Sequence, residues 1–492
     1  MRRIAYLCIL IGICICTSCS KQVIEEPQLD NPYNPGFEYG DFPVTAMFVT
    51  DVRASIIWRG KSLGGRFDIY INDTLHRTVE KTTNDTLAIE DIYHLTPNTN
   101  YDIKVRWVPQ DGSVKFGKVS FTTEPRFLLQ SYKALNLDKF AFESYTITKA
   151  IRSGNGMLFT LTCKKSAYNV HDYVIVIKAD PSGEVVWARE FAHSGYKNTK
   201  IMWDGSILLV TRKNVYHISS GGDLLAHYNF DYPQEKGIEI RDAAVLKDGR
   251  IVVVGSSVRK WGKDDTLWEE YYVASLSQDG RILSETISSV NKFNKFERIE
   301  MMDNGNLLTA GVTGNGLHDH EPGTRFEYSY YNGTFTTAIL NSDAQIVENN
   351  EHEGFGCCKT AGSAKGEDGN FYFLVRDMYD SYWGTANCSG IVGMDSNGNM
   401  IRHMTYDNPS SNPYALFVSG EEIIITQDVS ITQDSRILLT EKLGEKTSEW
   451  HAYGYKFIYA EKEDDNILCI DQYGNALLFN IKGYVKYPFE IK

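Results

Sequence analysis

The second part of the chain alternates short apolar runs with polar turns, and this pattern repeats. Each repeat has an apolar strand-like run, a polar turn that usually contains Gly, and a second run. Another hairpin of the same kind precedes each one. Four segments that align with one another are Tyr173–Phe191, Tyr271–Ile287, Thr334–Glu351 and Ser389–Tyr406. The repeats predict four-stranded units, which start near Ile147, Lys200, Arg241, Arg298, Thr360, Pro413 and Tyr455.

The spacing between these starting residues predicts a closed ring of sheets. Four-stranded units packed radially protect their own edges, which is the architecture of a β-propeller. We therefore predict an all-β chain in which residues 126–492 form a β-propeller, with seven blades as the best count and six or eight as the alternatives. The apolar run Phe127–Leu135 is expected to pair with the last unit and help to close the ring.

A different pattern occupies residues 42–124. Short strand-like runs such as Ala54–Trp58, Arg66–Asp73 and Tyr101–Val108 follow one another with turn signals between them, which predicts a β-sandwich. The run Leu95 to Tyr101 and the ending "FTTEP" resemble the fibronectin type III pattern. The resemblance implies that Trp58 and Tyr101 belong to the core of the sandwich and not to a functional site.

The N-terminus resembles a bacterial lipoprotein signal. Arg2 and Arg3 precede an apolar run from Ile4 to Ile15, which is shorter than the roughly 20 residues of a membrane-spanning helix. Residues 1–18 are then expected to be cleaved, and Cys19 to carry the lipid. Residues 19–41 contain three prolines and no apolar periodicity, so they are predicted to form an extended tether.

The lipid is expected to be the chain's only attachment to a membrane, because no later apolar run reaches spanning length. Ser20 follows Cys19 where Asp would suggest retention in the inner membrane, and the pair Glu25-Glu26 resembles export signals of surface lipoproteins in Bacteroidetes. We therefore predict an outer-membrane protein that faces the cell surface. The net charge of −13 argues against nucleic acid as a partner.

Long insertions occur between the second and third strands of three adjacent repeats. They comprise Val258–Tyr272, Thr313–Gly333 and Arg376–Cys388, and propeller geometry places all three at one face. Long loops in compact domains are usually functional. Their aromatic and cationic residues are the candidate ligand-binding set: Trp261, Trp268, Tyr328, Tyr330, Tyr331, Tyr379, Tyr382, Trp383, Arg325 and Arg376.

Aromatic rings next to charged groups suit a sugar, which has an apolar face and an edge of hydroxyls. We therefore expect a non-catalytic protein that binds a glycan or a cell-surface protein. The alternative is a polysaccharide lyase or glycoside hydrolase acting on an acidic glycan, since Tyr, His and Arg residues also occur in these loops. His318 and His320 have the spacing of metal ligands but lack an identifiable third ligand, so no metal is expected.

The repeats also resemble a broad group of bacterial secreted propellers and, more distantly, quinoprotein-type propellers. The quinoprotein family carries a Trp at the end of nearly every repeat, whereas here only Trp187 fits. No cofactor is therefore expected, and no intact catalytic motif is present.

Five cysteines lie beyond the N-terminal region. Cys388 is expected to form a disulfide with Cys357 or Cys358, because all three are predicted at the same face of one blade. Cys163 and Cys469 fall in the middle of predicted second strands and are expected to be buried thiols.

The lipid anchor leads to the first testable prediction. Metabolic labelling with a fatty acid is expected to mark the full-length protein, and Cys19→Ala is expected to abolish the label because the acceptor thiol is lost. A label that persists in the Cys19→Ala variant would show that the anchor prediction is wrong.

Overall fold

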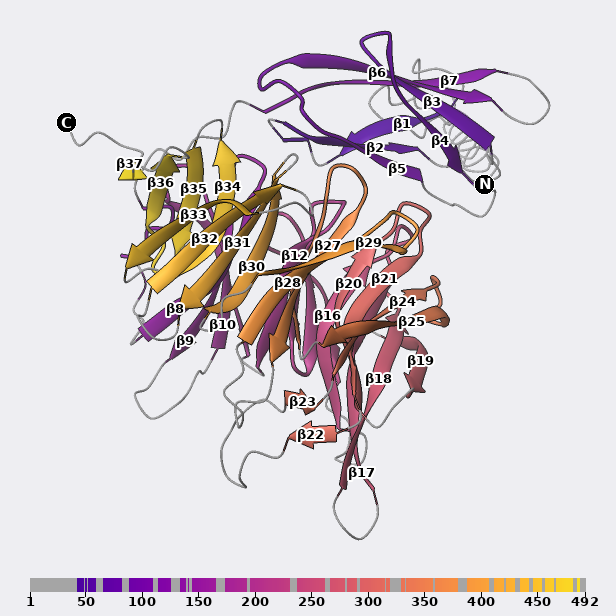
Figure 1. The fold of residues 1–492 in the computed structure, drawn as a ribbon. Helices are drawn as coiled ribbons and strands as arrows, with labels where there is room; N and C mark the ends of the chain where they lie inside the picture. The colour runs from indigo at the N-terminus through magenta and orange to yellow at the C-terminus, as the bar shows by residue number, and fades with distance from the viewer. Residues whose placement is uncertain are drawn as a thin grey trace, which may run out of the picture. The chain divides into compact units, whose positions relative to one another are not determined.

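A computed structural model describes most of the chain from residue 42 to residue 486, and every element in the described part is a β-strand (Figure 1). It does not describe residues 1–41, 48, 51, 59–64, 82–87, 109–113, 125–132, 139, 141–143, 165–172, 193–194, 231–236, 262–265, 279–280, 290–292, 315, 319–328, 332, 357–358, 379–386, 407–410, 420–421, 430–433, 442–445, 454–455, 464–465, 481–484 and 487–492. The predicted signal peptide, Cys19 and the tether lie outside the described residues. The described residues include no helix long and apolar enough to cross a membrane.

The chain divides into two compact units. The first contains Ala54–Ile92, Thr99–Thr123 and the described residues up to Val49. The second contains Glu124–Lys492 with the short segments Thr50–Arg53 and Tyr93–Asn98. Each unit is described by itself below.

The first unit has two antiparallel sheets. One contains β1 (Val44–Met47), β2 (Ala54–Trp58) and β5 (Ala88–Ile92), in the order β1-β2-β5. The other contains β3 (Gly65–Ile71), β4 (Thr74–Lys81), β6 (Asn100–Val108) and β7 (Lys115–Thr122), in the order β4-β3-β6-β7.

The two sheets share an aromatic core. The ring of Phe67 lies 5.3 Å from that of Trp58 and 6.3 Å from that of Trp107, measured between centroids. Trp58 is almost completely buried and Tyr101 is buried as well. The prediction that Trp58 and Tyr101 are core residues is therefore confirmed.

The second unit is built from antiparallel four-stranded groups. The first two are β8 (Ser144–Ser153), β9 (Gly156–Lys164), β10 (Tyr173–Ala179) and β11 (Val185–Ala192), followed by β12 (Tyr196–Ile201), β13 (Ile207–Thr211), β14 (Asn214–Ile218) and β15 (Leu224–Asn229). An eight-stranded sheet then contains β16 (Ile238–Val245), β17 (Ile251–Trp261), β18 (Thr266–Leu276), β19 (Ile282–Ser288), β20 (Phe293–Met301), β21 (Leu307–Gly314), β24 (Thr334–Leu340) and β25 (Ile346–Gly356). It consists of two four-stranded groups joined by one parallel pair, Glu269 with Phe293.

The remaining strands complete the unit. A two-stranded sheet of β22 (Gly316–His318) and β23 (Ser329–Tyr331) lies in the connection between β21 and β24. Three further four-stranded sheets are β26 (Lys359–Lys365), β27 (Phe371–Met378), β28 (Asn387–Met394) and β29 (Met400–Tyr406); β30 (Ser411–Ser419), β31 (Glu422–Val429), β32 (Asp434–Glu441) and β33 (Lys446–Tyr453); and β34 (Phe457–Glu463), β35 (Asn466–Asp471), β36 (Ala476–Asn480) and β37 (Val485–Lys486).

The first strands of these groups form a closed ring. Each of β8, β12, β16, β20, β26, β30 and β34 contacts the next, and β34 contacts β8. A shared apolar cluster of residues from β8, β9, β10, β34, β35 and β36 seals the junction between the first and the last group. Lys133, at the end of the run expected to close the ring, forms a bridge with Asn475. The second unit is therefore a β-propeller whose innermost strands are the first of each group.

Repeated polar turns join the strands. At Asp395–Asn399 the Asp395 carboxylate accepts hydrogen bonds from the backbone N–H groups of Asn397 (2.9 Å) and Asn399 (2.8 Å). Gly398 takes the left-handed conformation there, with φ 87°, because a residue without Cβ adopts it at no steric cost. The Gly-containing polar turn predicted between the two strands is therefore confirmed at this position.

Every innermost strand changes register at the same place. The shift falls just before Lys149 in β8, Asn198 in β12, Asp242 in β16 and Arg298 in β20. Corresponding shifts occur in β26, β30 and β34. A bulge bends a strand and re-aims the next side chain, so these shifts place equivalent residues of successive strands at one level of the ring.

At the bulge of β20, the second strand requires a glycine. A Cβ on Gly311, in β21, would lie 1.9 Å from the backbone oxygen of Lys295 and 2.8 Å from the Cα of Phe296. The backbone cannot yield easily, so Gly311→Ala is expected to destabilise the protein by about 1–3 kcal/mol. Thermal unfolding of the purified protein measures this effect.

Gly362→Ala is the matched control. Gly362 also lies beside a bulge, but a Cβ there would meet its nearest atom at 3.6 Å, an ordinary contact. This variant is expected to unfold close to the parent's transition. Equal melting temperatures for the Gly311 and Gly362 variants would contradict the packing argument.

Candidate functional site

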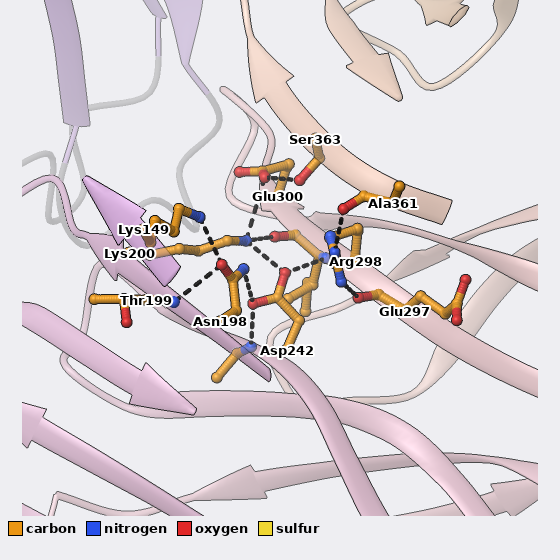
Figure 2. A network of polar contacts seen from close by, with 12 residues as sticks. Lys149, Asn198, Thr199, Lys200, Asp242, Glu297, Arg298, Glu300, Ala361 and Ser363 are labelled. Carbon is orange, nitrogen blue, oxygen red and sulfur yellow. Dashed lines mark hydrogen bonds and ion pairs between the residues drawn. The ribbon is translucent and has the colours of Figure 1, made fainter. Parts of the chain in front are cut away.

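A network of charged and polar side chains lies on the innermost strands of the ring (Figure 2). Its members come from β8, β12, β16, β20 and β26. The bulges bring Lys149, Asn198, Asp242 and Arg298 to the same level in four successive strands. Charged groups so far inside a domain need partners, and their hydrogen bonds define what this site can do.

Asp242 is the most enclosed member of the network, with no measurable solvent exposure. One carboxylate oxygen accepts hydrogen bonds from Asn198 Nδ2 and from its neighbour's backbone N–H, both at 2.9 Å. The other accepts the backbone N–H of Ile299 at 3.1 Å and pairs with Lys200 Nζ at 2.7 Å. Both oxygens are fully used, so this carboxylate is a structural anchor.

Lys200 joins two carboxylates. Besides Asp242, its ammonium group lies 3.2 Å from Glu300 Oε1 and donates to the backbone oxygen of Ile299. Burial alone would lower the pKa of Lys200, but these two carboxylates outweigh it and raise the pKa above its usual range. Glu300 also accepts the hydroxyl of Ser363, from β26, at 2.5 Å.

Lys149 has a different environment. Its ammonium group donates to Asn198 Oδ1 at 2.6 Å, and no carboxylate of the described chain pairs with it. Burial, reinforced by the positive charge of Arg298, lowers the pKa of Lys149 to about 8. Lys149 is therefore a cation held by a neutral amide.

Arg298 resembles Lys149 in lacking a carboxylate partner among the described residues. Its guanidinium group donates to the backbone oxygen of Glu297 at 2.6 Å and to that of Ala361. Two cations on the innermost strands are thus held by neutral groups, whereas the neighbouring carboxylates are used by Lys200.

A second set of ion pairs lies at and just before the bulges on β12, β16 and β20. Burial acts against ionisation of Glu239, yet Arg241 and Lys197 hold its pKa at about 2. The Lys197 ammonium lies 2.6 Å from Glu239, and Arg241 lies 3.3 Å from it. Glu297 similarly pairs with Lys295 at 3.1 Å and accepts the backbone N–H of Thr360. These carboxylates are neutralised and hold adjacent strands together.

The network is suited to electrostatic binding more than to proton transfer. Its carboxylates accept several hydrogen bonds or are paired with cations, whereas a general base needs an available lone pair. Among the described residues, no group of three or more His, Cys, Asp or Glu side chains is arranged to hold a metal ion.

Some predicted ligand-binding residues lie in strands. Trp261 ends β17 and Trp268 lies in β18, where Trp261 pairs with Thr266 and Trp268 pairs with Arg259. The prediction that Trp268 lies in a loop is therefore wrong: the inserted residues continue the hairpin in register to its tip. Tyr330 and Tyr331 lie in β23, and Arg376 lies in β27 opposite Lys359 and Ser389.

The other predicted residues lie outside the described part of the chain. They are Arg325, Tyr328, Tyr379, Tyr382 and Trp383. Cys357 and Cys358 are also outside it, while Cys388 lies in β28 opposite Asp377, so the disulfide stays a prediction. Cys163 and Cys469 are buried free thiols, as predicted, and burial raises the pKa of Cys163 to about 12.

Two of the predicted insertions extend from the same end of the propeller. In Figure 1 the β17–β18 hairpin and the β22–β23 sheet both lie below the four-stranded groups. The described backbone thus brings Trp261, Trp268, Tyr330 and Tyr331 to one end of the sheets.

The innermost network was not predicted from the sequence. The available signal was charge within the first strand of each repeat, as in Lys149, Lys200, Asp242, Arg298 and Glu300. In a propeller the first strand of each repeat is the innermost one, so charged residues on neighbouring first strands lie close together.

Comparisons with known proteins give distant likenesses to solved structures. No family model and no curated protein matches this chain. The structure of the Dos1 propeller has 10% identity and a TM-score of 0.40, covering 73% of this chain and 90% of its own.

Two Bacteroides thetaiotaomicron structures are also similar. A quinoprotein alcohol dehydrogenase-like protein has 11% identity and a TM-score of 0.38, covering 84% of this chain and 95% of its own. The extracellular domain of a putative hybrid two-component system has 12% identity and a TM-score of 0.38, covering 89% of this chain and 51% of its own. Likeness at this level carries no argument about activity or ligand.

The two lysines of the network lead to opposite expectations. Lys200→Met removes the cation beside the fully buried Asp242 carboxylate, and breaking such a pair costs about 3–5 kcal/mol. Lys149→Met removes a cation that has no carboxylate partner in the part of the chain that the structure describes, so at pH 7 the variant is expected to be as stable as the parent or more stable. Chemical denaturation of both variants measures the difference.

The effect of Lys149→Met is expected to depend on pH. Below pH 8 the lysine is charged in both the folded and unfolded states, and the folded state bears the cost of the partly buried charge. Between about pH 8 and the usual lysine pKa of 10.5, only the folded state releases the proton, so the parent regains roughly 1–3 kcal/mol relative to the variant. A stability difference that does not change over this pH range would contradict the assignment.

Proposed function

We propose that this chain is a non-catalytic binding protein, attached to the outer membrane through lipid on Cys19 and facing the cell surface. It takes a glycan or a protein partner through the end of the propeller that bears the inserted strands. The observation that carries this proposal is the extension of β17 and β18 past their sheet, at the same end as the inserted β22–β23 pair. Elements added to one end of a repetitive scaffold are typical of binding sites.

The proposed architecture supports this role. We propose a seven-bladed ring, because seven first strands contact one another in sequence and all share the same bulge. We also propose that the first unit is a fibronectin type III-like domain, since its sheet orders and its buried Trp58 and Tyr101 suit that fold. Such a module would serve as a spacer, and the propeller would carry the binding surface.

A shortened hairpin tests the site. The N–H of Val258 donates to the backbone oxygen of Gly237 and therefore points away from β18. Hydrogen-bonded and non-hydrogen-bonded pairs alternate along an antiparallel ladder, so the next pair, Arg259 with Trp268, is hydrogen-bonded. A two-residue turn can close a pair of this kind. The variant replaces residues 260–267 with Asn-Gly and carries Trp268→Thr. It removes both tryptophans while keeping the register of the remaining strands.

The parent is expected to be retained by at least one member of a panel of neutral and acidic polysaccharides in affinity electrophoresis. The shortened variant is expected to bind about tenfold more weakly, because each lost aromatic platform contributes about 0.5–1.5 kcal/mol. Its melting temperature is expected to match the parent's. Equal binding by the two proteins would exclude the hairpin from the site.

The same panel separates binding from catalysis. A lyase acting on an acidic glycan releases unsaturated products that absorb ultraviolet light, so the absorbance of each mixture is followed over time. No increase is expected. A steady increase with any polysaccharide would overturn the non-catalytic proposal and favour the lyase alternative.

A further inference from the structure

We propose that Lys149 and Arg298 bind an oxyanion at the level of the innermost strands, such as the carboxylate, sulfate or phosphate group of a ligand. This second site is separate from the inserted strands, and it stands even if the binding role of those strands fails. The argument rests on how the two cations are held, what their neighbours already bind, and whether solvent reaches them.

Lys149 is held in position by one of the three N–H donors of its ammonium group. An ammonium group has three N–H donors, and the one hydrogen bond that Lys149 makes within the described chain is with Asn198 Oδ1. Asn198 is itself fixed, because it donates to Asp242 and accepts the backbone N–H of Thr199 at 3.0 Å. The lysine is therefore held in one direction by a rigid neutral group.

Arg298 is fixed in a similar way. Two of its five N–H donors are used by the backbone oxygens of Glu297 and Ala361, on adjacent innermost strands. Backbone acceptors orient the guanidinium group without neutralising it. Lys149 and Arg298 lie in the same network in Figure 2, and after burial the positive charge of Arg298 is the next largest cause of the lowered pKa of Lys149.

The neighbouring carboxylates of the described chain form no hydrogen bond or ion pair with Lys149 or Arg298. Asp242, on β16, and Glu300, on β20, both pair with Lys200, on β12. This triad carries one surplus negative charge, which attracts Lys149 through space but reaches it with no hydrogen bond in the described chain. An oxyanion between Lys149 and Arg298 would relieve their repulsion and use their remaining donors.

Solvent can reach this level of the ring. Lys149 and Arg298 are both partly exposed, although they lie on the innermost strands. A purely structural ion network would pair each cation with a carboxylate, as Lys200, Lys197 and Lys295 are paired. The contrast within one set of strands points to a ligand as the missing partner.

Isothermal titration calorimetry of the whole chain tests the proposal with three probes: sodium sulfate, sodium phosphate and sodium glucuronate. Each is titrated at pH 7 against a chloride buffer of equal ionic strength. Saturable binding of at least one anion is expected, and the tightest binder indicates whether the natural group is a sulfate, a phosphate or a sugar carboxylate.

Two variants identify the site. Lys149→Met is expected to weaken binding at least tenfold. Lys178→Met is the matched control, because Lys178 is also a partly buried lysine with a pKa of about 8, but it lies on β10 and donates to the backbone oxygen of Ser153. It is expected to bind as the parent does.

The pH dependence gives a second readout that a general salt effect would not produce. Affinity is expected to fall by about tenfold or more between pH 7 and pH 10, as Lys149, with a pKa of about 8, loses its proton while Lys200, whose pKa is raised, keeps its own. No saturable heat with any of the three anions, or equal affinity in the parent and Lys149→Met, would overturn the proposal.

Discussion

The buried carboxylate of Asp242 is the interaction on which the centre of the ring depends. It accepts hydrogen bonds from β12 through Asn198 and Lys200, and from β20 through the backbone of Ile299. A charge without solvent exposure is tolerated only when it is paired and hydrogen-bonded. Three successive strands must therefore keep their bulges in register, or this carboxylate loses its partners. Apolar packing alone would set no such requirement on the relative positions of the strands.

The same constraint extends to the rest of the ring. Asn198 also accepts a hydrogen bond from Lys149 on β8, and Glu300 accepts one from Ser363 on β26. Farther round, Arg152 on β8 pairs with Glu461 on β34 at 2.7 Å. Polar contacts between innermost strands thus accompany the apolar clusters that lie deeper between the sheets. They fix the relative height of neighbouring groups, while Lys149 and Arg298 are held by neutral groups.

The sequence predicted the features that depend on local pattern. The alternation of apolar runs and polar turns predicts the all-β propeller, and mid-strand positions predict the burial of Cys163 and Cys469. The innermost network could not be predicted in this way, because which side chains meet across the ring depends on bulges that join distant strands. Trp268 was placed in a loop for a related reason: charged and aromatic residues at a hairpin tip resemble a loop, although backbone pairing continues through them.

The parallel pair of Glu269 with Phe293 gives the ring an uneven stiffness. Elsewhere in the described chain, neighbouring four-stranded groups meet mainly through side chains, with single backbone hydrogen bonds from Ile240 N–H to Arg212 and from Ile147 N–H to Gln472. Such contacts can separate without breaking a β-ladder. Here backbone pairing fuses two groups into one eight-stranded arc. Subglobal opening takes the route of lowest free energy, so the fused arc should stay closed while other seams fluctuate. The long hairpin formed by β17 and β18 belongs to this arc, so its base is expected to open later than the other seams.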